Sequence, residues 1–261
     1  MVAKPYFPTT RDLPASPAQR ILDSLLNLIY PERCFICAAP VARRHECSVC
    51  ANCWTRAMSL KIAPPRCASC GLPFQSFQDT SEYLCGNCIL RIPPYAGARS
   101  FGYYTGELSR MIQGLKFQGR RNVAGLLAPL LTSTFFENWG REDFNLLVPV
   151  PLHPRRKRER GFNQSEVLTR LLARQLAVPW IPALIRVRPT VPQVGLTESQ
   201  RQENVRKAFR CRNPRQISKS RVLLIDDVMT TGATVASAAQ ALRDAGALRV
   251  SVLTVARAAK W

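Results

Sequence analysis

The chain has 261 residues, of which 46% are hydrophobic, and it carries a formal net charge of +20 at pH 7. This length supports one substantial α/β core together with a smaller module. No apolar run approaches the ~20 residues that a transmembrane helix needs, so we expect no membrane insertion. The charge favours anionic partners such as phosphates, nucleic acid or an acidic surface. Residues 1–95 hold +4 of this charge and residues 96–261 hold +16, so the expected anion site lies in the second part.

Residues 1–28 form a polar segment that several prolines interrupt, and we expect it to end in a short helix. It contains no apolar stretch of the kind found in a signal peptide. We therefore expect a cytoplasmic protein, in which cysteines stay reduced.

A block of cysteines follows. Nine of the ten cysteines fall between positions 34 and 88, and most of them form C-x-x-C pairs. The pairs are Cys34/Cys37, Cys50/Cys53, Cys67/Cys70 and Cys85/Cys88. A C-x-x-C knuckle directs two thiolates at one point, and two knuckles complete the tetrahedral four-sulfur site that zinc prefers. Four thiolates leave no open coordination position, so we expect two structural Zn²⁺ ions in a double zinc-ribbon module over residues 29–92.

The grouping of these cysteines has alternatives. Sequence order places the first two pairs on one ion and the last two on the other, whereas a cross-braced arrangement joins the first pair with the third. Cys47 is an alternative ligand because "CSVC" at 47–50 is itself a C-x-x-C. Disulfides are the competing interpretation, and the missing signal peptide disfavours them. His45 lies outside the regular spacing, and Cys211 stands alone in a basic stretch.

After a proline-containing linker, residues 96–261 alternate between helix and strand patterns. The apolar spacing of Leu108, Met111, Ile112 and Leu115 predicts a helix over 106–117. Further helices are expected over 122–136, over 163–177 with Asn163 and Glu166 spaced as a capping box, and over 233–246. Strands are expected over 144–152, 221–226 and 248–258. This alternation is typical of an α/β fold with a mostly parallel sheet and helices on both faces, whose ligands bind at the carboxyl ends of the strands.

The stretch VLLIDDVMTTGAT at 222–234 combines an acidic pair with a loop of small residues before a helix. Small residues allow backbone N–H groups to close on an anion, and a helix N-terminus adds a partial positive charge, so the loop is expected to hold a phosphate. The loop residues are Thr230, Thr231, Gly232, Ala233 and Thr234. Asp226 and Asp227 precede them, where carboxylates accept hydrogen bonds from ribose hydroxyls or hold Mg²⁺ through water. The spacing matches neither a Walker A loop nor a dinucleotide-binding fingerprint.

This stretch resembles the 5-phosphoribosyl-1-pyrophosphate (PRPP) binding motif of type I phosphoribosyltransferases. With "VPVPLHPRRKRERGFNQSE", "TVPQVGLTESQRQENVRKAF" and the cysteine block, the chain resembles the ComF (ComFC/GntX-like) family over roughly residues 22–258. The resemblance implies a type I phosphoribosyltransferase-like domain over 96–261, with PRPP as substrate or ligand and Mg²⁺ as cofactor. Asp226 and Asp227 would bind the ribose hydroxyls, and residues 230–234 the 5′-phosphate. The loop formed by Leu152, His153, Pro154, Arg155 and Arg156 would face the pyrophosphate, with the two arginines and two aspartates as the catalytic set.

The resemblance also places residues 188–207 where a flexible loop closes over the site in these enzymes, which would exclude water from an oxocarbenium-like state. Basic charge gathers in residues 155–160, net +4, and in residues 186–221, net +8. This exceeds what one PRPP needs, so single-stranded DNA is a credible second ligand, with Arg155, Arg156, Lys157 and Arg158 as contacts. Lys116 is either a phosphate contact or an ordinary surface lysine.

Three functions stay open. The chain is a ComF-type protein that handles single-stranded DNA in competence and natural transformation or in the use of DNA as a nutrient. Alternatively, it is a salvage phosphoribosyltransferase, a pentosyl-transferring enzyme that acts with PRPP and Mg²⁺ on an unidentified base. In the third reading it is a non-catalytic PRPP-sensing adaptor. The resemblance further implies a DNA-uptake helicase or another competence protein as a partner.

Overall fold

The computed structural model describes residues 32–41, 49–74, 83–187 and 208–258. The predictions for residues 1–28, for Cys47 and for the loop 188–207 therefore lie outside the described residues, as does His45. Across the described part of the chain, no helix is both long and apolar enough to cross a membrane.

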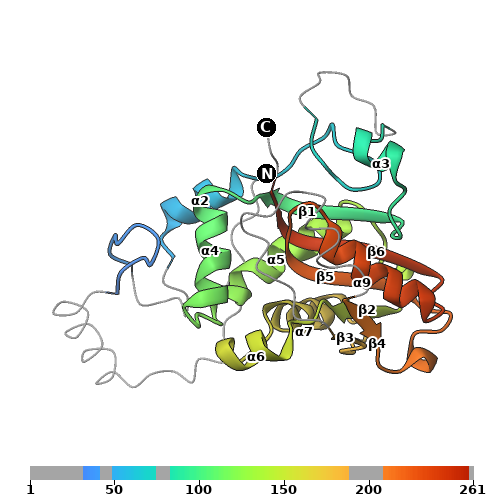
Figure 1. Ribbon diagram of the computed structural model, residues 1–261. Coiled ribbons are helices and arrows are strands. Elements are labelled where there is room, and N and C mark those ends of the chain that lie inside the picture. The colour runs from blue at the N-terminus through green and yellow to red at the C-terminus, as the bar shows by residue number, and fades with distance from the viewer. Residues whose placement is uncertain (1–31, 42–48, 75–82, 188–207, 259–261) are drawn as a thin grey trace.

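A parallel sheet of four strands in the order β1-β6-β5-β2 forms the centre of the fold (Figure 1). Its strands are β1 (Gly97–Tyr103), β2 (Leu146–Pro149), β5 (Arg221–Met229) and β6 (Arg249–Arg257). The long strands β5 and β6 pair along their whole length, from Arg221↔Arg249 to Met229↔Arg257. β2 pairs only with Val222–Ile225 of β5, so the last residues of β5 extend beyond the end of their neighbour.

Both faces of the sheet are covered, as the alternation of apolar residues in β5 requires. Leu223 and Ile225 pack under one face with the helices α4 (Gly106–Phe117), α5 (Val123–Phe136) and α7 (Gln164–Leu176). Val222 and Leu224 pack under the other face, against α9 (Ala233–Asp244) and the small antiparallel sheet of β3 (Leu184–Arg186) and β4 (Phe209–Cys211). The predicted α/β fold with helices on both faces is confirmed.

Several predicted elements have different limits or were missed. The strand expected over 221–226 continues to Met229, so Asp226 and Asp227 lie within it. The basic run after β2, expected as a loop, forms the short helix α6 (Pro154–Arg160), which begins at a proline and ends at Gly161 with a φ of +75°. β1, β3 and β4 were not predicted, nor were the helices α2 (Ala51–Met58) and α3 (Gly86–Leu90) or the 3₁₀ turns Arg141–Asp143 and Pro214–Gln216.

The cysteine-rich segment covers the outer edge of β1 rather than standing apart from the sheet. The amide of Ile62 donates to Phe101 O at 2.9 Å, and the amide of Tyr103 donates to Leu60 O at 2.9 Å. Further along the strand, the amide of Ala98 donates to Ser69 O at 2.7 Å. These bonds pair backbone groups that an exposed edge strand would leave open.

Candidate functional site

The acidic pair lies at the carboxyl end of β5, just beyond the last residue of β2. Because β2 ends at Pro149, the chain leaves the sheet there and opens a pocket beside Asp226 and Asp227. The pocket is lined by Lys116, Val150, Pro151, Leu152, Arg156, Arg160, Ser165, Arg186, Asp226, Asp227 and Thr234. The site therefore occupies the position in which parallel α/β sheets bind ligands.

Two side chains from the helices of one face hold the acidic pair. Lys116, in the last turn of α4, lies with its Nζ 2.7 Å from Asp227 Oδ1. Ser165, in the first turn of α7, donates its hydroxyl to Asp226 Oδ1 at 2.8 Å, and the amide of Asp227 donates to the same oxygen at 2.9 Å. The carboxylates are thus oriented by fixed partners before any ligand is bound.

The pair is electrostatically strained all the same. Burial and the neighbouring charge of Asp227 raise the pKa of Asp226 from 3.8 to about 7, although Ser165 and Lys116 act in the opposite direction. Burial is the largest single influence on Lys116 and would lower its pKa, but the charge of Asp227, the hydrogen bond to it and the charge of Asp226 together raise the net pKa. Lys116 therefore stays protonated, and the pair binds a cation or a hydroxyl-rich ligand best where Asp226 is ionised.

Three arginines line the same pocket as the acidic pair. Arg156 and Arg160 come from α6 and Arg186 comes from β3. Burial lowers the pKa of both Arg160 and Arg186, and the charge of Arg156 lowers each further. An anion relieves the repulsion between like charges held this close, so these three arginines suit the pocket to a polyphosphate.

The loop of small residues reaches the site through Thr234. Gly232 caps α9 with a φ of +83°, a conformation that L side chains rarely adopt, and a Cβ there would lie 2.7 Å from Met229 Cε. The amide of Ala233 donates to Thr231 Oγ1 at 3.4 Å, and Thr234 lines the pocket. Of the predicted phosphate loop, Thr234 thus lines the same pocket as the acidic pair, whereas residues 230–233 do not line it.

The residues that were predicted to face the pyrophosphate divide into two groups. Leu152 and Arg156 line the pocket. Arg155 is 78% exposed and pairs with Glu159 Oε1 at 3.0 Å along α6, while His153 caps that helix by accepting a bond from the amide of Arg155. The structure therefore brings together Arg156, both aspartates and Thr234, and it leaves Arg155 and His153 outside the pocket.

The eight cysteines gather in two clusters, Cys34/Cys37/Cys50/Cys53 and Cys67/Cys70/Cys85/Cys88, the grouping expected from sequence order. Within each cluster, the four sulfurs lie within 4.8 Å of one another. The Cys37–Cys50 and Cys70–Cys85 sulfur distances are both 3.6 Å, far too long for a disulfide. Zn–S bonds of about 2.3 Å in a tetrahedron place sulfurs roughly 3.8 Å apart, so the donor sets fit zinc.

Within each cluster, neighbouring thiols and backbone groups shift one another's pKa values in opposite directions. A hydrogen bond from Cys70 lowers the pKa of Cys67 to about 4, whereas that same contact raises the pKa of Cys70. Burial raises the pKa of Cys53 and would raise that of Cys34, but backbone N–H donors bring Cys34 down to about 6. All four thiols of a cluster ionise together only when a divalent cation offsets their repulsion.

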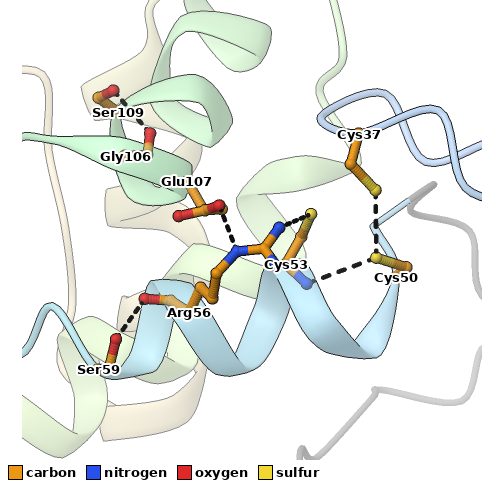
Figure 2. Close-up of polar contacts among 8 residues, drawn as sticks. All are labelled: Cys37, Cys50, Cys53, Arg56, Ser59, Gly106, Glu107 and Ser109. Atoms are coloured by element: carbon orange, nitrogen blue, oxygen red, sulfur yellow. Dashed lines mark hydrogen bonds and ion pairs between the residues drawn. The ribbon is translucent and has the colours of Figure 1, made fainter.

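An arginine ties the first cluster to the helix that carries Lys116. Figure 2 shows Arg56 of α2 between the cluster and α4: it donates to Cys53 Sγ at 3.2 Å and to Glu107 Oε1 at 2.5 Å. Glu107 lies in the first turn of α4 and Lys116 in its last. At the second half of that helix, a Cβ on Gly114 would lie 2.9 Å from the ring of Phe35, so the knuckle also packs there.

A second arginine ties the other cluster to the end of β5, next to the loop 230–234. Arg257, buried at the end of β6, donates to Cys70 O at 2.7 Å and lies 3.5 Å from Cys70 Sγ. It also reaches the sulfur of Met229, which precedes the loop, at 3.1 Å. The two clusters belong to the apolar cores on opposite faces of the sheet. Arg56 joins the first cluster to the helix that carries Lys116, and Arg257 joins the second to Met229 at the end of β5.

Comparison with known proteins fits this architecture. "Double zinc ribbon domain" matches residues 25–89, and "Phosphoribosyl transferase domain" matches residues 163–260. DNA utilization protein YhgH of Salmonella typhimurium is 36% identical over 236 residues, which cover 88% of this chain and 99% of the relative. Competence protein F of Haemophilus influenzae is 33% identical over 74% of this chain and 85% of its own length. The chain belongs to the ComF family.

A more distant member of the ComF family, Competence protein ComFC of Bacillus subtilis, is 28% identical over 80% of this chain and 84% of its own length. The ComF proteins in this comparison carry the names of DNA utilization or competence proteins. The present ComF protein joins two tetracysteine clusters, which fit zinc, to a phosphoribosyltransferase-like domain.

Sequence reasoning missed part of the pocket. Ser165 and Arg160 lie in the motif at 148–166, but no local pattern marks either as a site residue. Arg186 belongs to a short strand with no distinct pattern, and the sequence alone leaves Lys116 open between a phosphate contact and a surface lysine. Helix-end position was a usable signal, because Lys116 and Ser165 both lie in the terminal turn of a helix that covers the sheet.

Proposed function

We propose that this protein binds PRPP together with Mg²⁺ at the pocket beside the acidic pair and that it handles single-stranded DNA. The observation that carries the proposal is that one pocket is lined both by two carboxylates, Asp226 and Asp227, and by three arginines, Arg156, Arg160 and Arg186. A sugar bearing phosphates at both ends needs hydroxyl acceptors at its centre and cationic groups beyond. The motif at 222–234 and the phosphoribosyltransferase match support the same ligand.

The roles in the pocket follow from chemistry. Asp226 and Asp227 accept hydrogen bonds from the ribose hydroxyls, and the loop 230–234 receives the 5′-phosphate at the start of α9. Arg156, Arg160 and Arg186 neutralise the pyrophosphate. When bound, Mg²⁺ would add charge neutralisation on the pyrophosphate oxygens. If transfer occurs, the bond between C1 of the ribose and the pyrophosphate oxygen breaks as C1 bonds to the acceptor, and the arginines stabilise the negative charge on the leaving pyrophosphate.

Calorimetric titration with PRPP, ribose 5-phosphate and pyrophosphate, each with Mg²⁺, tests the ligand. PRPP can contact both the aspartates and the arginines, whereas each fragment contacts mainly one of these groups. PRPP should therefore bind at least about tenfold more tightly than either fragment. Equal affinity for PRPP and pyrophosphate would reduce the site to a general polyanion pocket and overturn the proposal.

The DNA part of the proposal rests on charge and on the relatives' printed names. Helix α6 presents Arg155, Lys157 and Arg158 to solvent beside the pocket. Exposed lysines and arginines of this density bind the phosphate backbone, with an affinity that falls steeply with salt. Two relatives are named a DNA utilization protein and a competence protein, which supports DNA as the ligand of this surface.

A matched pair of variants tests this surface. Lys157→Ala/Arg158→Ala removes two charges from α6, and Arg212→Ala/Arg215→Ala removes two exposed charges from the segment after β4. We expect the first variant to weaken single-strand binding and to lower its salt slope by about 1.4, while the second stays close to wild type. Identical losses in both variants would mean that overall charge, and not α6, determines binding.

Turnover is a separate question, and the salvage enzyme is the second candidate function. The phosphoribosyltransferase-like domain favours it. Pyrophosphate release from PRPP, measured across a panel of bases and with single-stranded DNA, distinguishes an enzyme from a PRPP sensor. Release that depends on one acceptor would establish the enzyme, and release with none would leave a binding protein.

A further inference from the structure

An exposed phenylalanine lies where the basic surface meets the pocket. We call residues 116–121 and 154–160 together the α4–α6 surface. It contains eight basic side chains and one acidic side chain. Its two segments are joined by Arg121, which donates to Gly161 O at 3.4 Å, and by Arg160, whose guanidinium lies 4.6 Å from the centre of the Phe117 ring.

Three arginine–aromatic pairs occur in this region, and they differ in exposure. Arg121 covers Phe162, which is buried, and Arg120 covers Phe35, which is partly buried against α4. Those two pairs stabilise the packing of the chain. Phe117, in contrast, is 68% exposed. Burial therefore does not account for an aromatic ring at this position.

An exposed aromatic ring among basic side chains is an arrangement on which single-stranded nucleic acid stacks. Bases stack on an aromatic face regardless of sequence, and a guanidinium beside the ring adds a cationic contact to the backbone. Double-stranded DNA offers no free base face, so this chemistry selects a single strand.

We infer that Phe117 is a base-stacking platform for single-stranded DNA at the mouth of the pocket, and that Arg160 makes the strand and PRPP compete. Arg160 serves both sites: it lines the pocket and lies over the ring. When pyrophosphate is bound, the guanidinium of Arg160 pairs with it in the pocket and is no longer available to the DNA strand. The inference rests on the proposed function, since it assigns a role to residues of that same site.

Substitutions at Phe117 separate stacking from bulk and charge. Phe117→Leu keeps an apolar side chain and removes the aromatic face, and Phe117→Trp enlarges that face. The control is Phe136→Leu, which removes another exposed ring, 58% exposed, at the end of α5. Affinity for a fluorescent oligothymidine should fall about fivefold or more in Phe117→Leu and stay at or above the wild-type level in Phe117→Trp. Phe136→Leu should match wild type.

PRPP affinity, measured on the same proteins, should stay within about twofold of wild type in all three variants, because Phe117 does not line the pocket. If wild type binds oligothymidine and Phe117→Leu binds it with the same affinity, the stacking inference is wrong while the proposed function stands. If wild type binds no single strand, the DNA part of the proposed function fails as well.

The competition has its own readout. Saturating PRPP with Mg²⁺ should weaken oligothymidine binding to wild type, and oligothymidine should weaken PRPP binding by the same factor. The matched control is Asp226→Asn/Asp227→Asn, on whose DNA binding PRPP should have no effect. If wild type saturated with PRPP binds oligothymidine as tightly as wild type without PRPP, or more tightly, then Arg160 does not serve both ligands.

Discussion

Lys116 at the end of α4 holds Asp227 of β5 at an Nζ–Oδ1 distance of 2.7 Å, with both side chains largely buried. Since α4 is also fastened at its first turn to a zinc-type cluster through Arg56 and Glu107, the lysine is positioned by two parts of the chain. The pair thus connects the cysteine-rich segment with the ligand pocket.

Replacing Lys116 by Gln should weaken PRPP binding and make it more dependent on pH. The lysine charge lowers the pKa of Asp226, so its loss raises that pKa further above neutrality. A charge-assisted hydrogen bond contributes about 1.5 kcal/mol or more, which corresponds to roughly tenfold in affinity. Titration at pH 7 and pH 8.5 should show the larger loss at pH 7. Lys61→Gln, which removes an exposed lysine paired with Glu137, serves as the control. A pH-independent loss would refute this role.

The raised pKa of Asp226, about 7, also predicts how stability varies with pH in the absence of ligand. A carboxyl with a raised folded-state pKa contributes stability that is complete below its unfolded pKa, near 3.8, and that is lost as pH rises through about 7. Asp226→Asn removes this dependence, so its melting temperature should exceed that of wild type by a margin that grows from pH 4.5 to pH 8. The free-energy difference gained over this range is on the order of 1–3 kcal/mol. The control Asp244→Asn, at an exposed residue, should differ from wild type by the same amount at every pH. A constant difference between Asp226→Asn and wild type would show that the pKa of Asp226 is not raised.

Metal content follows from the two clusters. Purified protein should contain two zinc ions per chain, and Cys53→Ser and Cys70→Ser should each contain one, because each removes one ligand from a different cluster. Cys211→Ser should keep both ions. Both single-site variants should also melt at lower temperature, since the clusters are part of the cores on the two faces of the sheet. Two ions in Cys53→Ser would show that Cys47 replaces it, contrary to the grouping described above.

A pair of glycines tests the packing of the cysteine-rich segment on β1. A Cβ at Gly102 would lie 2.7 Å from the backbone oxygen of Leu60 and 2.9 Å from Leu108 Cδ2. Gly102→Ala should therefore destabilise the protein by about 1–3 kcal/mol. Gly125→Ala, inside α5 with no atom within 4 Å of the added carbon, should be neutral or stabilise by up to about 1 kcal/mol. Chemical denaturation compares the two, and similar stabilities would argue against this contact.

Local patterns predicted the elements whose residues carry their own signal. The apolar spacing of Leu108, Met111, Ile112 and Leu115 predicted α4, and all four are fully buried. Asn163 caps α7 as expected, but Glu166 pairs with Lys157 and Arg170 and does not complete the expected box with Asn163. The acidic pair and the loop after it stood out because glycine and small residues mark close backbone approach.

Other features depend on tertiary contacts and left no trace in the sequence. β1 begins with Gly97 and reads as a linker, because its stability comes from pairing with β6 and from the backbone of residues 60–69. The cysteine spacing indicated two metal clusters, but it carried no information that they would lie on opposite faces of one sheet. Arg186 reaches the pocket only because β3 and β4 pair beside α9.

The central claim is that Asp226 and Asp227 form the sugar side of a PRPP site. Calorimetric titration of PRPP with Mg²⁺ into Asp226→Asn/Asp227→Asn, beside wild type and Asp244→Asn, tests it most directly. We predict binding to wild type and to Asp244→Asn with the same affinity, and a loss of at least about 100-fold in the double variant, as expected when two charged hydrogen-bond acceptors are removed. Equal PRPP affinity in all three proteins would contradict the account.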